Sequence, residues 1–300
     1  MSGSATRAPR ALVIGDVMVD YIARLEGPIA VGSDRRAAIA RRSGGSAANQ
    51  AVWLAHFGVG VDFVGRVGRA DHERESQALR GAGVEPALAA DDELETGRLI
   101  ALVDPAGERS FLTDRGANDA LEAADIPEAL LARAALVHLT GYSFVAPSPR
   151  AAAIDVIARA AGRPIGVDPA SAEFLREIGP ENFLEWTRGA TMLFPNSEEA
   201  AVLAATDDHE AQAARLAAWY PLVVIKRGAA GCEAIAGAQR WRADARAARA
   251  IDSTGAGDAF VSAFLTARLR GEPIETGLTR AVAAGAAATE IIGGRPEPGD

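Results

Sequence analysis

The stretch Asp252-Ser-Thr-Gly-Ala-Gly-Asp258 leads into an apolar segment, 261–269, whose hydrophobic residues recur at helical spacing. The pattern predicts a helix that begins within Gly255-Ala256-Gly257. Glycine costs a helix about 1 kcal/mol per residue, so two glycines at its start need a reason. They let backbone N–H groups approach a ligand, and a helix N-terminus carries unpaired donors and a partial positive charge. We therefore predict an anion site at Gly255, Ala256 and Gly257.

Asp258 lies in the first turn of this helix, beside the predicted anion site. A hydroxyl group is a poor nucleophile until it loses its proton, and a nearby carboxylate can accept that proton as attack proceeds. The alternative is that Asp258 only complements the helix dipole while the glycines form a tight turn. The segment is neither a Walker A loop, which needs a lysine near its end, nor a dinucleotide fingerprint, which needs a third glycine.

Composition sets the broad class. The chain has 300 residues, 49% of them hydrophobic and 24% charged, which is ordinary for a soluble globular domain. A net charge of −9 disfavours nonspecific binding to nucleic acid or anionic lipid. Cys232 is the single cysteine, so no disulfide framework can form and a buried thiol is expected. We see no secretory signal, and the apolar run 281–292 is too short to cross a bilayer, which favours a cytoplasmic protein.

Short apolar runs alternate with helical patterns along the chain. The expected strands are 11–15, 61–65, 136–139, 164–168, 192–194 and 222–225. The expected helices include 46–57, 71–80, 148–161, 198–205 and 210–220. This alternation predicts a mainly parallel sheet with helices on both faces. Two regions break it, about 17–42 and 96–113, and the second contains a hairpin turn at Asp104-Pro-Ala-Gly-Glu108, so we expect a small β lid.

Polar residues gather near the start of the chain. Asp16 and Asp20 follow the first expected strand, and ligands of open parallel sheets bind beyond the carboxyl ends of strands. The segment Ser43-Gly44-Gly45-Ser46 precedes a helix in which Asn49 lies about one turn along. Its glycines let backbone amides meet a ligand, and the Asn49 amide can bind hydroxyl groups as donor and acceptor. The alternative is a glycine turn with Ser46 as a helix cap and a solvated Asn49.

These segments, taken together and in order, resemble the ribokinase-like (PfkB) carbohydrate kinase family over nearly the whole chain. The matching motifs are Gly15-Asp16…Asp20, Gly44-Gly45…Asn49-Gln50, Gly65-Arg-Val-Gly68…Asp71, Gly83-Val84, Gly97…Asp104…Gly107-Glu108-Arg109, Asn196-Ser-Glu-Glu199, Lys226-Arg-Gly228 and Asp252 to Asp258. The resemblance implies a ribokinase-like three-layer α/β/α sandwich with a mainly parallel central sheet and a small β lid. It implies one kinase domain over residues 1–300.

The resemblance also implies roles for single residues. It implies an ATP-dependent kinase that transfers the γ-phosphoryl group to a hydroxyl of a small sugar, with Mg²⁺ as cofactor. Asp258 would be the general base, and the amides of Gly255, Ala256 and Gly257 the anion hole. Asp16, Asp20, Gly44, Gly45 and Asn49 would bind the sugar. The nucleotide side would use Asn196, Glu199, Lys226, Arg227, Gly228, Thr254 and Gly257. Glu199 would hold Mg²⁺ through water, and Asn196 and Glu199 also read as a capping box.

Several alternatives stay open at this point. Some relatives bind a monovalent cation such as K⁺ where Asp252 and Thr254 stand, and the resemblance does not settle whether this chain does. The acceptor is a simple sugar or, second, a nucleoside, and a non-catalytic protein that senses sugar or nucleotide is the alternative from another class. Exposed lid strands also favour a homodimer. The residues that could face the substrate are Arg98, Arg109, Arg115, Asn118, His138 and Tyr142.

Overall fold

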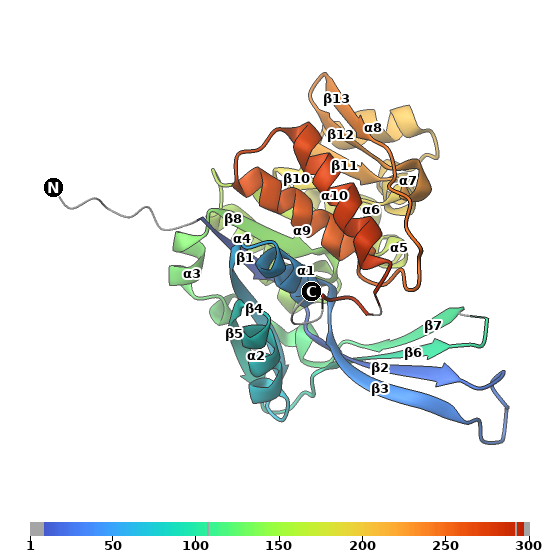
Figure 1. The fold of residues 1–300 in the computed structure, drawn as a ribbon. Coiled ribbons are helices and arrows are strands. Elements are labelled where there is room, and N and C mark those ends of the chain that lie inside the picture. Colours follow the sequence, from blue (N-terminus) through green and yellow to red (C-terminus); the bar gives the residue numbers. More distant parts are fainter. Residues whose placement is uncertain (1–8, 107, 292, 297–300) are drawn as a thin grey trace.

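A sheet of nine strands forms the centre of the computed structural model, which describes residues 9–106, 108–291 and 293–296 (Figure 1). In spatial order its strands are β13 (Gln239–Ala243), β12 (Cys232–Ala236), β11 (Leu222–Lys226), β10 (Met192–Leu193), β9 (Ile165–Asp168), β8 (Leu136–Thr140), β1 (Arg10–Ile14), β4 (Gly60–Gly68) and β5 (Val84–Asp91). Pairing is parallel from β11 to β5, whereas β12 and β13 add an antiparallel edge. The predicted mainly parallel sheet is confirmed.

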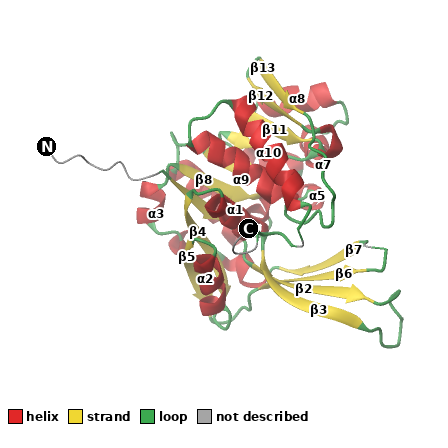
Figure 2. Cartoon of the chain, viewed as in Figure 1, coloured by secondary structure: helices red, strands yellow, loops and turns green. Residues whose placement is uncertain are grey.

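Helices cover both faces of this sheet (Figure 2). The first core contains buried residues of α3 (Glu128–Arg133), α4 (Pro147–Arg159), α5 (Ala172–Ile178), α6 (Pro180–Trp186), α7 (Ser197–Ala204) and α8 (His209–Ala217). The second contains those of α1 (Ser46–His56), α2 (His72–Gly81), α9 (Ala256–Leu269) and α10 (Ile274–Ala288). Strand β1 shows why two cores form: Leu12 and Ile14 enter the first, while Ala11 and Val13 enter the second. Alternate side chains leave a strand on opposite faces, so an unbroken apolar run demands cover on both.

A second sheet of four strands extends away from the main body at the lower right of Figure 1. Its order is β3 (Ala37–Gly44), β2 (Met18–Leu25), β6 (Gly97–Val103) and β7 (Arg109–Asp114). Strand β2 pairs antiparallel with β3 and parallel with β6, and β7 closes the second hairpin. These strands come from the two regions in which the alternation of the sequence breaks. We call this sheet the lid.

Several polar residues meet where the parallel strands end. Strand β1 ends two residues before Asp16, β9 ends at Asp168, and β11 ends at Lys226. The carboxyl ends of parallel strands share one edge of the sheet, which is where ligands bind in open α/β sheets. The lid and the first turns of α1 and α9 lie at this same edge (Figure 1). Functional side chains from distant parts of the sequence are therefore brought to one place.

Two smaller expectations concern Cys232 and membrane spans. Cys232 is buried in β12, as expected of a structural thiol. Within the part of the chain that the structure describes, no helix has the length and apolar character needed to cross a membrane.

Candidate active site

The segment from Asp252 to Asp258 lies between two cavities. Asp252 and Thr254 line one cavity of about 580 Å³, and Ala256 and Gly257 line another of about 540 Å³. Helix α9 begins at Ala256, after Gly255 in the left-handed conformation with φ of 77°. The N–H groups of the first turn have no partner one turn earlier in the helix, so they are suited to an anion. The predicted anion hole therefore sits at the junction of the two cavities.

The carboxylate of Asp258 is held by three side chains from the first turn of α1. Ser46 Oγ and Gln50 Nε2 donate to Oδ1 at 2.8 and 2.9 Å, and Asn49 Nδ2 donates to Oδ2 at 3.2 Å. Burial raises the pKa of Asp258 to about 7, and the nearby Asp168 adds to the rise, while the three donors oppose it. A carboxylate with a pKa near neutrality is well matched to accept a proton from a hydroxyl group.

The first turn of α1 is fixed by backbone geometry at the hinge of the lid. Gly45 has φ of 96°, and a Cβ there would lie 2.6 Å from the carbonyl oxygen of Asp16. A Cβ on Gly44 would lie only 2.2 Å from Oδ2 of Asp20. Gly45 therefore brings α1 close to the start of the lid strand β2, because only glycine tolerates this positive φ and backbone contact, whereas a side chain at position 44 would have to displace the Asp20 carboxylate.

Asp16 is engaged by the protein itself. Its two carboxylate oxygens accept hydrogen bonds from the backbone N–H groups of Ser46 and Ala47 at 2.9 and 3.1 Å, and Thr140 Oγ1 donates at 3.2 Å. It thus complements the N-terminus of α1, which is favourable for an anion. Asp16 is buried and does not line the cavity beside Thr254. A substrate contact through Asp16 stays a prediction.

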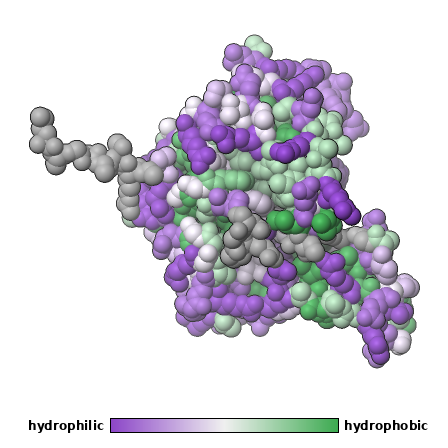
Figure 3. Space-filling model, in the orientation of Figure 1, coloured by the Kyte–Doolittle hydropathy of each residue, from purple (hydrophilic) through white to green (hydrophobic). Residues whose placement is uncertain are grey.

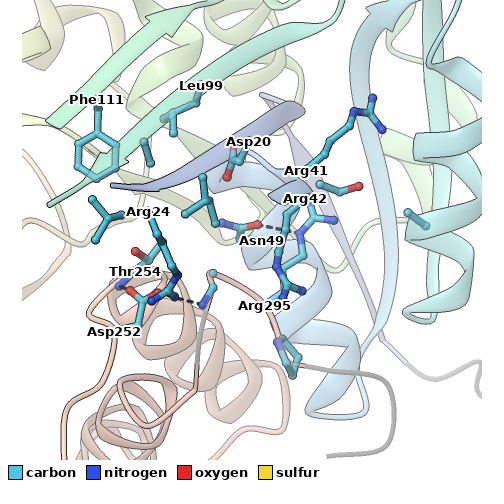
Figure 4. A pocket seen from close by; sticks show the side chains of 18 of the residues that line it. Asp20, Arg24, Arg41, Arg42, Asn49, Leu99, Phe111, Asp252, Thr254 and Arg295 are labelled. Atoms are coloured by element: carbon cyan, nitrogen blue, oxygen red, sulfur yellow. Dashed lines mark hydrogen bonds between the residues drawn. The ribbon is translucent and has the colours of Figure 1, made fainter. Parts of the chain in front are cut away.

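The cavity of about 580 Å³ lies between the lid and the body, and we call it the acceptor cavity. Figure 4 shows side chains from the lid, from α1 and from the C-terminal segment around it, among them Asp20 and Asn49. Oδ1 of Asp20 is buried and has no hydrogen-bond partner among the described residues. Burial raises the pKa of Asp20 to about 6, although Arg295 opposes the rise. An unsatisfied buried acceptor of this kind is ready to accept a ligand hydroxyl.

Arg295 connects the C-terminal segment to α1. Its Nε donates to Oδ1 of Asn49 at 2.7 Å (Figure 4), and its Nη2 donates to the carbonyl oxygen of Gly44 at 2.8 Å. Because the amide oxygen of Asn49 is occupied in this way, the amide nitrogen is left to face Asp258. Arg295 therefore orients the side chain that positions the candidate base. It was not predicted, since nothing in the sequence places residue 295 beside residue 49.

The cavity of about 540 Å³ on the other side of the anion hole is mainly apolar, and we call it the nucleotide cavity. It lies between β11, α9, α10 and the segment 245–250. Its walls include the small or apolar residues Ala229, Ala245, Ala248, Ala250, Phe260, Val282, Gly285 and Ala286. Of the residues predicted for the nucleotide side, Asn196, Lys226 and Gly228 line this cavity, whereas Arg227 pairs with Glu233 at 2.6 Å and lies outside it, and nucleotide binding here stays a prediction. A flat aromatic base suits such a slot.

Asn196 and Glu199 form a capping box at the start of α7. Asn196 N and Nδ2 donate to the two oxygens of Glu199 at 2.7 and 2.8 Å, and Glu199 N donates back to Asn196 Oδ1 at 2.9 Å. Burial raises the pKa of Glu199 to about 7, while Lys226 opposes the rise. Both oxygens of Glu199 are occupied by Asn196, and no cluster of three metal-ligand side chains occurs among the described residues. A contact of Glu199 to Mg²⁺ through water stays a prediction.

The candidate site for a monovalent cation is the turn formed by Asp252 and Thr254, directly before the predicted anion hole at the start of α9. Asp252 Oδ1 accepts a hydrogen bond from Thr254 N at 2.8 Å, and Oδ2 accepts one from Gly293 N at 3.1 Å. The carboxylate thus joins the start of α9 to the C-terminal segment. Use of K⁺ at this turn stays a prediction.

Comparison with known proteins places the chain among sugar kinases. The model of the pfkB family carbohydrate kinases matches residues 8–298. An ATP-dependent ribose-1-phosphate kinase of Halopiger xanaduensis is 31% identical, over 93% of this chain and 90% of its own length. The crystal structure of an adenosine kinase from Sinorhizobium meliloti superposes with a TM-score of 0.88 at 26% identity, covering 97% of this chain and 96% of its own. The chain belongs to the pfkB family of carbohydrate kinases. The predicted ribokinase-like fold and carbohydrate kinase class are confirmed.

The residues that line the acceptor cavity of this pfkB kinase are not the ones expected from the sequence to face the substrate. Of the residues expected to face the substrate, Arg98, Arg115, Asn118, His138 and Tyr142 do not line it, and the side chain of Arg109 lies outside the described residues. Arg115 stacks on Tyr142, and Asn118 bonds the backbone of Val17, so both are structural. The arginines that line the cavity are instead Arg24, Arg41, Arg42, Arg74 and Arg295. Strand alternation could have indicated Arg24, since it lies four residues after Asp20 on β2 and therefore on the same face of the strand.

Three further residues of the kinase site were missed. Gln50 donates to Asp168 at 3.1 Å as well as to Asp258, and its oxygen contacts His138. Lys226 Nζ lies 3.1 and 3.2 Å from the two oxygens of Asp168. Burial acts against the charged form of Lys226, but the nearby Asp168 and Glu199 outweigh it and raise its pKa. Ser46, Gln50 and Asp168 thus complete the network around the base, and no role at the site was predicted for any of them.

The pH dependence of turnover tests this network. The value of kcat/KM should rise with pH, with a midpoint near 7, because Asp258 must be ionised to act as a base and its pKa is raised to about 7. Substitution Ser46→Ala removes a donor that stabilises the ionised form. We expect the midpoint to move to higher pH by up to about one unit. Ser110→Ala, on the exposed lid strand β7, should leave the profile unchanged. An identical midpoint in Ser46→Ala would contradict this role of Ser46.

Proposed function

We propose that this chain transfers the γ-phosphoryl group of ATP to a hydroxyl group of a small sugar, with Asp258 as the general base. The observation that carries the proposal is the position of the segment 252–258 between two cavities, one polar and one apolar. A nucleotide in the apolar cavity would present its terminal phosphate at the N-terminus of α9. An acceptor in the other cavity would present a hydroxyl at Asp258. The two reactants would then meet at the anion hole.

Each residue of the acceptor cavity has a task in this reaction. Asp20 would accept hydrogen bonds from sugar hydroxyls, and Asn49 holds the base in place through its amide nitrogen. Asp258 would take the proton of the attacking hydroxyl. The amides of Gly255, Ala256 and Gly257 would stabilise the charge on the transferring phosphoryl group. Lid and body together would exclude water from the reacting atoms.

The nucleotide side would be organised by α7 and β11. Mg²⁺, when bound with ATP, neutralises phosphate charge. Glu199 would hold it through water, and Lys226 would face the phosphates from the wall of the nucleotide cavity. One relative of the same fold, a ribokinase II from E. coli, was crystallised with ATP and Mg²⁺. Dependence of this chain on ATP and Mg²⁺ is part of the proposal.

Substitution of Glu199 tests the role in metal binding. We expect Glu199→Gln to raise the Mg²⁺ concentration for half-maximal turnover on the order of 10-fold, because a neutral amide attracts the hydrated cation less. Glu198→Gln, an exposed neighbour on α7, is the matched control. Equal Mg²⁺ dependence in both variants would leave Glu199 with the capping role alone.

Substitution of Asp258 tests the catalytic role. We expect Asp258→Asn to lower kcat by about 100- to 10,000-fold, because it removes the proton acceptor. The Kd of the acceptor, measured by calorimetry, should stay within about threefold of the unmodified protein. Asp207→Asn, at an exposed position, should behave like the unmodified protein. Loss of acceptor binding in Asp258→Asn would instead indicate a structural role.

Two other functions are distinguished by an acceptor panel. Phe111 lines the acceptor cavity and is 55% exposed, so a nucleoside base could stack there. ATP turnover with nucleosides but not with sugars would favour this second candidate. A protein that only senses sugar or nucleotide would show a ligand-dependent rise of its melting temperature without any ATP turnover. A cytoplasmic location also stays a prediction.

The outer face of the lid favours a homodimer. Ile39, Ile100 and Leu112 are 70%, 40% and 58% exposed, and the register of the strands puts all three on the face opposite Asp20. Apolar surface is visible over the lid in Figure 3. We expect a dimer in sedimentation velocity at micromolar protein, which Leu112→Asp should convert to monomer. A monomer alone at tens of micromolar protein would exclude this interface.

A further inference from the structure

The acceptor cavity carries positive charge although the chain as a whole is acidic. The net charge of the chain is −9. The charged residues that line the cavity are Arg24, Arg41, Arg42, Arg74, Arg295, Asp20 and Asp252. Arg41 is paired with Asp71 at 2.6 Å, so four arginines against two aspartates leave a local excess of cations. Like charges gathered in one cavity repel each other, so such an excess is unfavourable unless a ligand offsets it.

The arginines reach the cavity from separate parts of the fold. In the strand register of the lid, Asp20 of β2 lies opposite Arg42 of β3 and Leu99 of β6. Arg24 lies on the same face of β2 as Asp20, because side chains alternate along a strand. Arg74 lines the same cavity from α2, a helix outside the lid. Figure 4 shows Arg24, Arg42 and Arg295 around the cavity that also holds Asp20 and Asn49. Their convergence is a product of tertiary structure and not of one basic segment.

Two of these arginines have no internal role that explains them. Arg41 forms an ion pair with Asp71 at 2.6 Å, and Arg295 is bound to Asn49 and Gly44. Among the described residues, neither Arg24 nor Arg74 forms a salt bridge or a side-chain hydrogen bond, and both are exposed at the cavity wall. A neutral sugar would be served by the carboxylate of Asp20 and the amide of Asn49. Two further guanidinium groups are surplus to that task.

We propose that the acceptor is a sugar phosphate, whose phosphate group is bound by Arg24, Arg74 and Arg42. The inference rests on the proposed phosphoryl transfer and defines its acceptor. The planar guanidinium group matches phosphate oxygens in a two-pronged geometry, and charge-assisted hydrogen bonds of this kind are among the strongest in proteins. A cavity of about 580 Å³ accommodates a sugar with such a group.

The reaction balances without any further reactant. The free hydroxyl oxygen of the sugar phosphate forms a bond to the γ-phosphorus of ATP. The bond between that phosphorus and the β,γ-bridging oxygen breaks, and its electrons leave with ADP. The proton of the hydroxyl passes to Asp258 and then to solvent. The products are ADP and a sugar bisphosphate.

The test compares matched acceptors. ATP turnover is measured with ribose, ribose 1-phosphate, ribose 5-phosphate, ribonate and adenosine under identical conditions. We expect kcat/KM for one of the sugar phosphates to exceed that of ribose on the order of 100-fold, because each charge-assisted contact strengthens binding 10-fold or more. Higher kcat/KM for ribose or adenosine than for both phosphates would overturn the proposal. Higher kcat/KM for ribonate would overturn it in favour of a carboxylate.

Substitutions of Arg24 and Arg74 test whether these residues bind the phosphate group of the acceptor. Arg24→Gln and Arg74→Gln should each raise KM for the preferred sugar phosphate about 10- to 100-fold, with kcat changed less than about threefold. Their KM for ribose should be unchanged. Arg36→Gln, which replaces an exposed arginine of the lid loop outside the cavity, is the matched control. Equal KM values for the sugar phosphate in all three variants would overturn the assignment of these arginines.

A binding measurement separates this proposal from the proposed function. The melting temperature is recorded with each acceptor in the absence of ATP. A rise with sugar phosphate that is lost in Arg24→Gln supports the anion site even if no acceptor is turned over, and in that case the kinase function fails alone. Turnover of ribose together with no rise for any sugar phosphate overturns the anion site and leaves the kinase function standing.

Discussion

The contact between the first turns of α1 and α9 is the constraint on which the rest of the site depends. Ser46, Asn49 and Gln50 present three donors to Asp258, which lies in the first turn of α9. This contact aligns a carboxylate with a helix N-terminus, two groups that favour opposite charges on a ligand. Helix α1 begins directly after the lid strand β3, and the start of α9 lines the nucleotide cavity. One set of hydrogen bonds between the two helices therefore fixes the acceptor cavity and the nucleotide cavity relative to each other.

The site keeps carboxylates in surroundings that resist their ionisation. Burial raises the pKa of Asp20 to about 6 and that of Asp258 to about 7. The stability of the folded chain falls as the pH rises from about 4, where each carboxyl of the unfolded chain ionises, and the loss is complete above these raised pKa values. Such a cost is tolerated where a reaction needs a proton acceptor near neutral pH. Lys226, placed against Asp168, offsets part of the negative charge.

The lid has two faces with different chemistry. Alternation along β2 places Asp20 and Arg24 toward the cavity, while the opposite face carries exposed Ile39 and Leu112. Because side chains alternate along a strand, one face of the lid can contact a ligand while the opposite face contacts another protein surface. Gly45 permits close approach of the lid to α1, because a larger residue there would collide with the backbone at Asp16, and a larger residue at Gly44 would displace the carboxylate of Asp20.

The sequence by itself determined the layered fold, the lid regions and the glycine-rich start of α9, since apolar periodicity and glycine positions are local properties that determine local structure. It also indicated Asp258, Asn49 and Asp20 through a resemblance carried by several motifs. Only the tertiary structure decided that Asp16 caps α1, that Arg227 pairs with Glu233, and that Arg24, Arg74 and Arg295 line one cavity. The reason is physical. Contacts between residues far apart in sequence depend on how helices and strands pack, and no local pattern encodes them.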